Sequence, residues 1–210
     1  DGKGYISNEP GKGGLGDSEL AYHSDLAFTP EPFLGISLQA VNVANGRSAT
    51  RFVNSCRAFS KLPPTQQEKL RGLNAMHVFS VDMTGRNGED VPDGLPRAVH
   101  PLVMPHPKTG EEILYINLNQ TARIVELPAD ESAALIENLF TSTYDPADIY
   151  EHRWDMGDFI LWDNLALQHA RAKVTENVPR TLQRVVLARK GFFEQCPQFT
   201  HEQFQTPAAM

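Results

Sequence analysis

Short runs of β-favouring residues recur along this chain at intervals of roughly ten residues, and turn-forming residues separate them. The 210 residues include 15 glycines and 15 prolines, which favours many turns. Two pairs of runs flank short turn sequences and are interpreted as hairpins, with turns at 106–110 and 155–158. The predicted strands are residues 34–43, 75–81, 97–104, 112–117, 150–154, 159–162 and 181–189. This spacing predicts a mainly β fold, an antiparallel double-sheet jelly roll (also called a double-stranded β-helix).

A few helical insertions are expected between the strands. Residues 130–140 begin with acidic side chains and continue with apolar residues at helical spacing, so they form the clearest predicted helix. Shorter helices are predicted at 52–62 and 65–73, and residues 1–18 are interpreted as loop. A chain of this length has room for one domain with a sizeable core, so residues 1–210 are expected to form a single domain.

The composition excludes several classes of protein. A formal net charge of −7 opposes general binding to nucleic acids and to anionic membranes. No apolar run is long enough to span a bilayer, so a cytoplasmic protein is the default expectation. Cys56 and Cys196 lie far apart in the sequence and suggest neither a disulfide framework nor a zinc site. The expected partner is a small molecule, and the sequence leaves open whether the chain forms a homo-oligomer.

Two residues near the start of the chain could bind a metal ion together. His23 and Asp25 are two positions apart, and on an extended strand such residues project to the same face. Two imidazoles and one carboxylate on one face of an octahedron leave three positions open, as iron(II) oxygenases require for a bidentate cosubstrate and oxygen. A His-x-Asp pair arises easily by chance, so a surface turn or a hydrogen-bonded pair is the alternative.

A late segment of the chain supplies two arginines. If residues 180–186 form a strand, Arg180 and Arg184 point to the same face. Burying two guanidinium groups on one face is costly unless each meets an anion, so the pattern favours carboxylate ligands. The alternative is that one or both arginines lie at a solvated strand end.

Motifs along most of the chain, from about residue 22 to 189, resemble the taurine and chlorophenoxyacetate (TauD/TfdA) dioxygenase family of iron(II), 2-oxoglutarate-dependent enzymes. The motifs that carry the resemblance are H-S-D at 23–25, G-R-S-A-T-R-F at 46–52, H-P-L-V at 100–103, H-P-K-T-G-E-E-I-L-Y-I-N at 106–117, W-D-M-G-D-F-I-L-W-D-N at 154–164 and Q-H-A-R at 168–171. The resemblance implies the jelly-roll fold, with His23, Asp25 and His169 as the iron ligands. It also implies that Thr50 and Arg180 bind the distal carboxylate of 2-oxoglutarate.

The resemblance further implies that Arg184 holds an anionic group of the primary substrate and that Phe28 forms an aromatic wall of its pocket. Asn164 is expected to fix the loop before His169 through side-chain hydrogen bonds. Relatives usually have W-H-T-D and W-D-N-R where this chain has Y-H-S-D and W-D-N-L, which bears on substrate identity rather than on iron binding. Relatives also carry an amino-terminal segment without a counterpart here, so we expect either a fragment or a pocket built differently in that part.

The function expected from these residues is oxidation, most simply hydroxylation, of an aliphatic C–H bond in a small carboxylate or sulfonate, with release of succinate and carbon dioxide. The cofactors would be Fe(II), 2-oxoglutarate and oxygen. Two alternatives use the same residues differently. One is a zinc-dependent hydrolase with the same three ligands, and the other is a non-catalytic jelly-roll binding module.

Overall fold

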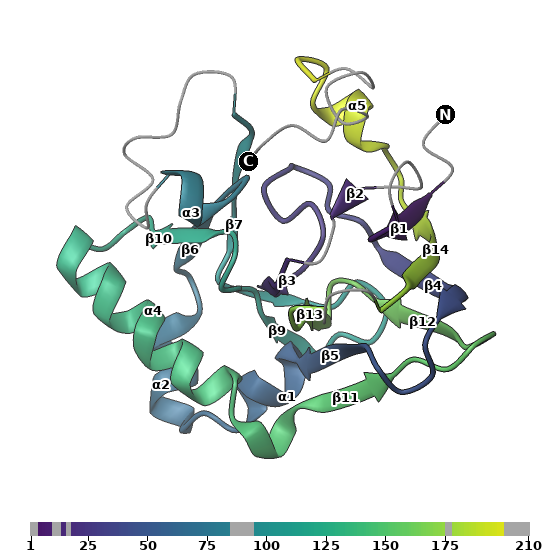
Figure 1. Ribbon diagram of the computed structural model, residues 1–210. Helices are drawn as coiled ribbons and strands as arrows, with labels where there is room; N and C mark the ends of the chain where they lie inside the picture. Colours follow the sequence, from purple (N-terminus) through teal and green to yellow (C-terminus); the bar gives the residue numbers. More distant parts are fainter. Residues whose placement is uncertain (1–3, 10–13, 16–17, 85–94, 175–177, 200–210) are drawn as a thin grey trace.

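Two of the four β-sheets in the described part of the chain pack face to face, and most of the helices lie along one side (Figure 1). A computed structural model describes residues 4–9, 14–15, 18–84, 95–174 and 178–199. Within this part of the chain, none of the helices has the length and apolar character that crossing a membrane requires.

The larger sheet has five strands, and all its neighbouring strands are antiparallel except the short pair at one edge. In spatial order they are β12 (Phe159–Asp163), β4 (Gly35–Val43), β14 (Arg180–Leu187), β1 (Tyr5–Ser7) and β2 (Gly14–Leu15). The smaller sheet has four antiparallel strands. In spatial order they are β11 (Tyr150–Arg153), β5 (Ala49–Asn54), β13 (Leu167–Arg171) and β3 (Leu20–His23).

A buried cluster joins the two sheets, because side chains from facing strands alternate into the space between them. Its members come from β4, β5, β12, β14 and the β11–β12 connection: Ile36, Leu38, Ala40, Val43, Phe52, Trp154, Trp162 and Leu182. The functional residues described below lie between the same two sheets, so this core holds them in place.

A second cluster lies under helices α1 (Ser55–Ser60), α2 (Pro64–Leu70) and α4 (Ala129–Thr143). The other helices are α3 (Val81–Thr84), the 3-10 helix η1 (Pro146–Asp148) and α5 (Phe192–Gln195). Additional short strands are β6 (Asn74–Val78), β7 (Arg97–Pro101), β8 (Val103–Pro105), β9 (Glu112–Leu114) and β10 (Thr121–Ile124). The α4 face that includes Ile136, Leu139 and Phe140 is buried in this cluster. Ser132 is buried on the same face because its hydroxyl accepts the backbone N–H of Ile124 at 2.8 Å.

Most long predicted elements are confirmed. The runs at 34–43, 75–81 and 181–189 correspond to β4, β6 and β14, and the helices predicted at 65–73 and 130–140 correspond to α2 and α4. The run at 97–104 divides into two strands, since β7 pairs with β6 while β8 pairs with β9. The hairpin predicted there is therefore formed by β8 and β9 alone.

The hairpin predicted around residues 155–158 is wrong. β11 pairs with β5 in the smaller sheet, whereas β12 pairs with β4 in the larger one. The connection crosses from one sheet to the other, with Trp154 fully buried at the corner and Gly157 at a φ of 88° in the turn. A tight turn between two strand patterns has the same local sequence in either arrangement, so only the packing of Trp154 distinguishes them.

Two other predictions were wrong at element boundaries. Residues 52–54 belong to β5, and helix α1 begins only after Asn54, whose side chain accepts the backbone N–H of Arg57 at 3.0 Å. The segment 1–18, interpreted as loop, contains β1 and β2 at the edge of the larger sheet. Strands of two or three residues are too short to show the alternation on which the prediction depended.

Candidate metal centre and its cavity

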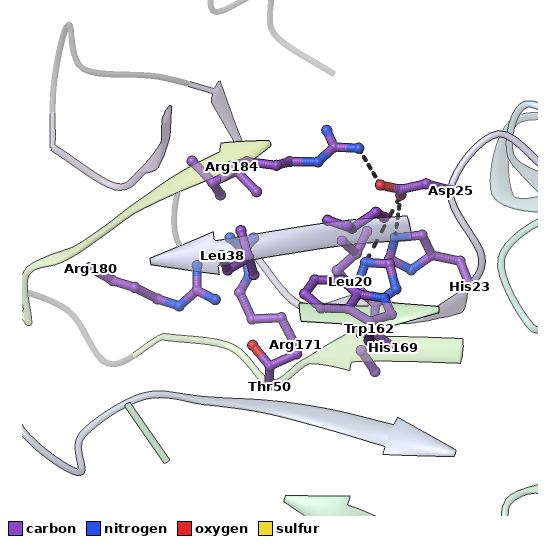
Figure 2. Close-up of a pocket in the computed structure, with 13 residues that line it drawn as sticks. Leu20, His23, Asp25, Leu38, Thr50, Trp162, His169, Arg171, Arg180 and Arg184 are labelled. Carbon is purple, nitrogen blue, oxygen red and sulfur yellow. Dashed lines mark hydrogen bonds and ion pairs between the residues drawn. The ribbon is translucent and has the colours of Figure 1, made fainter. Parts of the chain in front are cut away.

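A cavity opens between the two sheets, and charged residues occupy both of its ends (Figure 2). His23, Asp25, His169 and Arg184 lie at one end, and Arg180 lies at the other. The cavity is lined by Ile6, Leu20, His23, Asp25, Ile36, Leu38, Thr50, Trp162, His169, Ala170, Arg171, Arg180 and Arg184.

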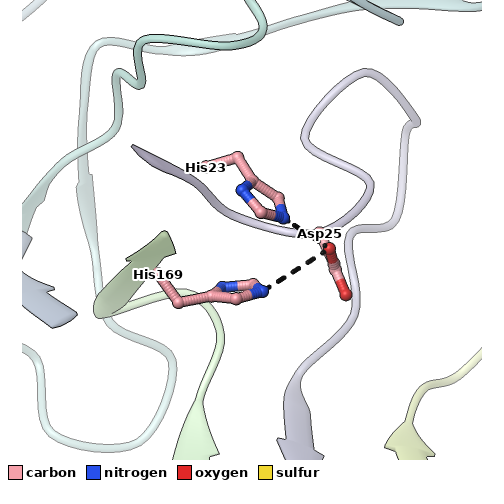
Figure 3. Close-up of side chains that lie close together, drawn as sticks. All are labelled: His23, Asp25 and His169. Atoms are coloured by element: carbon pink, nitrogen blue, oxygen red, sulfur yellow. Dashed lines mark ion pairs between the residues drawn. The ribbon is translucent and has the colours of Figure 1, made fainter. Parts of the chain in front are cut away.

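The structure brings His23, Asp25 and His169 together (Figure 3). β3 and β13 are paired neighbours in which His23 is directly opposite His169. Nε2 of His23 lies 3.2 Å, and Nε2 of His169 lies 3.9 Å, from Oδ1 of Asp25. One ligand atom from each residue falls within 4.8 Å of the other two. Two imidazole nitrogens and one carboxylate oxygen therefore face a common point.

The sequence predicted that His23 and Asp25 converge because they share one face of a strand, and this reason is wrong for Asp25. β3 ends at His23, and Asp25 lies in the turn that follows, next to Leu26 with its positive φ of 60°. The carboxylate reaches the imidazoles because the chain turns back after the strand, rather than because residues i and i+2 share a strand face. Leu26 adopts a backbone conformation that is uncommon for a residue other than glycine.

The protonation states of the three side chains suit metal binding. Nδ1 of His23 donates a hydrogen bond to the carbonyl of Ala21 at 2.8 Å, and Nε2 faces Asp25 and His169. Burial lowers the pKa of His169 to about 3, so the ring is neutral at pH 7. Burial alone would raise the pKa of Asp25, but Arg184, His23 and His169 hold it well below its usual range. Metal ligands must be deprotonated in this way.

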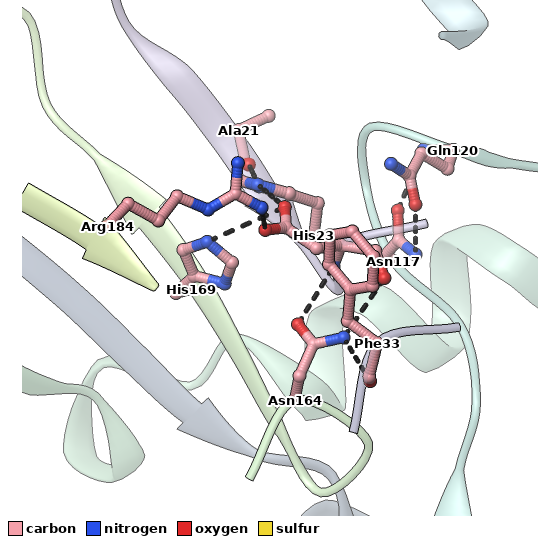
Figure 4. Close-up of polar contacts among 9 residues, drawn as sticks. Ala21, His23, Phe33, Asn117, Gln120, Asn164, His169 and Arg184 are labelled. Carbon is pink, nitrogen blue, oxygen red and sulfur yellow. Dashed lines mark hydrogen bonds and ion pairs between the residues drawn. The ribbon is translucent and has the colours of Figure 1, made fainter. Parts of the chain in front are cut away.

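Asn164 holds the turn that carries Asp25 (Figure 4). Its side-chain oxygen accepts the N–H of Asp25 at 2.8 Å, and its amide group donates to the carbonyls of Asp25 at 3.0 Å and of Phe33 at 2.8 Å. Asn164 is fully buried. Its side-chain hydrogen bonds tie the loop before His169, as expected, to the backbone of Asp25, another member of the cluster.

Arg184 contacts the cluster directly. Its Nη2 donates to Oδ2 of Asp25, which leaves Oδ1 directed toward the two imidazoles. Its guanidinium also lies over the ring of Phe33, with 5.8 Å from the guanidinium carbon to the ring centroid. The Arg184 side chain is 30% exposed, so a ligand in the cavity can contact it while it keeps its contact with Asp25.

The other end of the cavity contains Arg180 and Thr50. As predicted, Arg180 and Arg184 both face the space between the sheets from β14. Arg180 is 3% exposed, and its Nε has no hydrogen-bond partner in the described part of the chain. Burial, together with the charge of Arg171, lowers the pKa of Arg180 to about 9. The hydroxyl of Thr50 accepts the indole N–H of Trp154 at 3.0 Å, so its own proton is left to donate elsewhere.

Phe28 does not belong to the residues that line this cavity. Its ring is buried next to Phe79, at 5.2 Å between centroids, and Phe192, at 6.5 Å. Its predicted place in the wall of a substrate pocket stays a prediction.

Two cavity residues were missed from the sequence. Arg171 lies two positions after His169 in β13, and the alternation of a strand would have placed both on the same face. Trp162 packs in the core between the sheets, and its ring also lies 5.0 Å from that of His169 and forms a wall of the cavity.

Two histidines and one carboxylate facing a common point are the donor set found in non-haem iron(II) oxygenases. The family model for "Taurine catabolism dioxygenase TauD, TfdA family" matches residues 4–186. The chain therefore belongs to the TauD/TfdA family, and the predicted fold class and family resemblance are confirmed.

Individual relatives support the assignment. The chain is 29% identical over 189 residues to pentalenolactone F synthase of Streptomyces arenae, covering 82% of this chain and 63% of that protein. It is 29% identical over 168 residues to the alpha-ketoglutarate-dependent 2,4-dichlorophenoxyacetate dioxygenase of Cupriavidus pinatubonensis, covering 78% and 58%. The crystal structure of a taurine dioxygenase from Burkholderia xenovorans superposes with a TM-score of 0.72 at 27% identity, covering 88% and 60%. The chain thus spans about three fifths of the length of these relatives.

Proposed function

We propose that the protein is an iron(II), 2-oxoglutarate-dependent dioxygenase that hydroxylates an aliphatic C–H bond of a small anionic substrate. One observation carries the proposal. The nitrogen and oxygen atoms of His23, Asp25 and His169 converge at one end of a cavity whose other end holds a buried guanidinium.

The residues of the cluster fit a divalent metal ion. Two imidazoles and an ionised carboxylate form the donor set that suits non-haem iron(II). The hydrogen bond from His23 to the carbonyl of Ala21 fixes the tautomer, and the contact between Arg184 and Asp25 orients one carboxylate oxygen toward the imidazoles. When bound, the iron together with 2-oxoglutarate and oxygen supplies the oxidising chemistry, and succinate and carbon dioxide are released.

The opposite end fits the distal carboxylate of 2-oxoglutarate. A buried guanidinium is costly unless an anion accompanies it, and Nε of Arg180 is a buried donor without an acceptor among the residues that the structure describes. The hydroxyl of Thr50 can donate to the same carboxylate, since it already accepts from Trp154. A planar guanidinium and a hydroxyl would orient the dicarboxylate along the cavity. Ile36, Leu38 and Trp162 supply apolar walls that exclude water from the reacting groups.

Arg184 is the group proposed to bind the primary substrate. It brings a positive charge to the cluster end of the cavity and keeps part of its surface exposed. Relatives are named for taurine and for 2,4-dichlorophenoxyacetate, a sulfonate and a carboxylate, which supports an anionic substrate here.

Replacing Arg184 by glutamine is expected to weaken substrate binding by about 100-fold, because a charge-assisted hydrogen bond to an anion contributes about 2–3 kcal/mol. The measurement is KM across a panel of small carboxylates, sulfonates and amino acids, scored by succinate formation with iron and ascorbate present. Lys108→Gln, an exposed change outside the cavity, is the control. An unchanged KM in Arg184→Gln, combined with loss of turnover in Arg180→Gln, would remove the anionic-substrate proposal.

The two alternative functions predict different requirements. A zinc-dependent hydrolase would work with zinc and without oxygen, and a binding module would turn over nothing. We expect succinate from 2-oxoglutarate only with iron(II) and only under air, with less than about one tenth of that rate under argon or with zinc, because oxidative decarboxylation consumes oxygen. Equal turnover under argon would favour the hydrolase, whereas tight ligand binding without turnover under any condition would favour the binding module.

A further inference from the structure

A second cavity lies on the outer face of the smaller sheet, away from the metal cluster. Its volume is about 130 Å³, several times what one water molecule requires. Thr50 lines the first cavity, whereas its neighbour Arg51 lines the second, so strand β5 separates the two cavities. The charged and hydroxyl side chains that line the second cavity are Arg47, Ser48, Arg51, Glu151, Arg153 and Lys173.

Positive charge exceeds negative charge around this second cavity. Arg51 and Glu151 are directly opposite each other on β5 and β11, and Nε of Arg51 lies 2.8 Å from Oε2 of Glu151. The other carboxylate oxygen, Oε1, lies 2.7 Å from Nη2 of Arg153. One carboxylate is therefore shared by two guanidinium groups. Arg47 and Lys173 have no acidic partner within the part of the chain that the structure describes.

One further acidic residue acts on this group of charges. The pKa of Arg51 is raised by its hydrogen bond to Glu151, and the charge of Glu19 adds to this. Even when Glu19 is counted, four basic side chains meet two acidic ones. In a chain whose formal net charge is −7, a local surplus of positive charge attracts anions to this one place rather than to the surface in general.

The hydroxyl of Ser48 is a neutral hydrogen-bonding group in the same cavity. Ser48 is 7% exposed, and its Oγ has no hydrogen-bond partner among the described residues. Its backbone is fixed, because its carbonyl accepts the N–H of Trp154 at 2.9 Å. Buried hydroxyl groups normally have a partner, so a ligand oxygen in the cavity would complete the hydrogen bonding of Ser48.

We propose that the second cavity is a binding site for a small anion with two or more negative charges, such as a phosphate or a polycarboxylate. Arg47 and Lys173 donate charge-assisted hydrogen bonds to its oxygens, and Ser48 donates a neutral one. Arg51 and Arg153 hold Glu151 between them and add positive charge around the ligand. The site uses none of the residues assigned to metal, cosubstrate or substrate, so this inference does not rest on the proposed function.

The test measures the binding of inorganic phosphate and of citrate by titration calorimetry on the metal-free protein, in a chloride buffer of constant ionic strength. The two ligands distinguish a phosphate site from a polycarboxylate site. The variants are Arg47→Gln, Lys173→Gln and Ser48→Ala. Arg97→Gln is the matched control, because Arg97 is an exposed arginine of β7 outside both cavities. Arg180→Gln reports on anion binding in the first cavity.

Two charge-assisted hydrogen bonds correspond to a dissociation constant of about 1 mM or tighter for at least one of the two ligands. Arg47→Gln and Lys173→Gln are each expected to weaken its binding about tenfold, because each removes one of these bonds. Ser48→Ala should weaken it about threefold, as the loss of a neutral hydrogen bond does. Arg97→Gln and Arg180→Gln should stay within about twofold of the unaltered protein.

Three results would overturn the inference. One is the absence of binding of either ligand up to about 10 mM. Another is a loss of binding in Arg180→Gln without a loss in Arg47→Gln or Lys173→Gln, which would assign the anion to the first cavity. The third is an equal loss in Arg47→Gln and Arg97→Gln, which would indicate general attraction to surface charge. Should Ser48→Ala fail to fold, the two variants at the exposed positions Arg47 and Lys173 decide.

Discussion

Replacing His169 by alanine is expected to remove metal binding and, with it, turnover. Three donor atoms converge in this structure, and His169 supplies the one that comes from a different strand. Loss of a residue that merely supports a metal ligand commonly weakens metal affinity by 10- to 100-fold, so loss of the ligand itself should exceed about 100-fold. We expect manganese(II) to raise the melting temperature of the unaltered protein, because a metal that binds only the folded state stabilises it, and we expect the variant to lose this rise.

The measurement is a manganese(II) titration by calorimetry, followed by melting curves with and without the metal. His152→Ala is the matched control, because His152 is also partly buried but pairs with Asp158 outside the cavity. The control should keep both the affinity and the metal-induced shift in melting temperature. An unchanged metal-induced shift in His169→Ala would show that the three converging side chains do not bind the metal. The proposed iron site would then be refuted.

Long elements could be predicted from the sequence because their signals are local. β4, β14 and α4 are each long enough for their residue pattern to predict a strand or a helix. The path between sheets could not be predicted in this way. Whether β11 and β12 form a hairpin or enter different sheets depends on where Trp154 packs, and a buried corner has no signature in the turn sequence itself.

In the candidate site, too, local patterns predicted some features, whereas contacts between distant residues could not be predicted. His23, Asp25, His169 and Arg180 were predicted from motifs and, for Arg180, also from strand alternation, and the structure brings all four to one cavity. How they are held depends on contacts between residues far apart in the chain. The contact between Arg184 and Asp25 spans 159 positions, so no spacing rule could have indicated it.

Asn164→Ala is the second change with a large expected effect, this time on stability as well as on the metal site. Asn164 is fully buried and makes three hydrogen bonds to the backbone of Asp25 and Phe33. Alanine would leave the buried N–H of Asp25 and two carbonyls without these partners. Unsatisfied buried groups cost about 1–3 kcal/mol each, partly relieved by water entry, so the expected loss is about 2–4 kcal/mol in the free energy of unfolding.

In a chain of this size that loss corresponds to a fall in melting temperature of roughly 5–15 °C. The turn with Asp25 and the positive φ of Leu26 would also lose its tie to the β12–β13 connection, so manganese(II) affinity should fall by about 10- to 100-fold. Chemical denaturation, melting curves and calorimetric titration measure these quantities separately.

Asn45→Ala distinguishes this role from a general effect of losing an asparagine. The side chain of Asn45 also accepts a backbone N–H, that of Met156 at 2.9 Å, but it is exposed, and water can replace it. Its removal should therefore cost less than about 1 kcal/mol and leave metal affinity unchanged. If Asn164→Ala destabilised the protein but bound manganese(II) normally, Asn164 would support the fold without positioning Asp25. If both variants lost equal stability, the buried hydrogen bonds of Asn164 would have no special weight, since burial is the one property that separates the two positions.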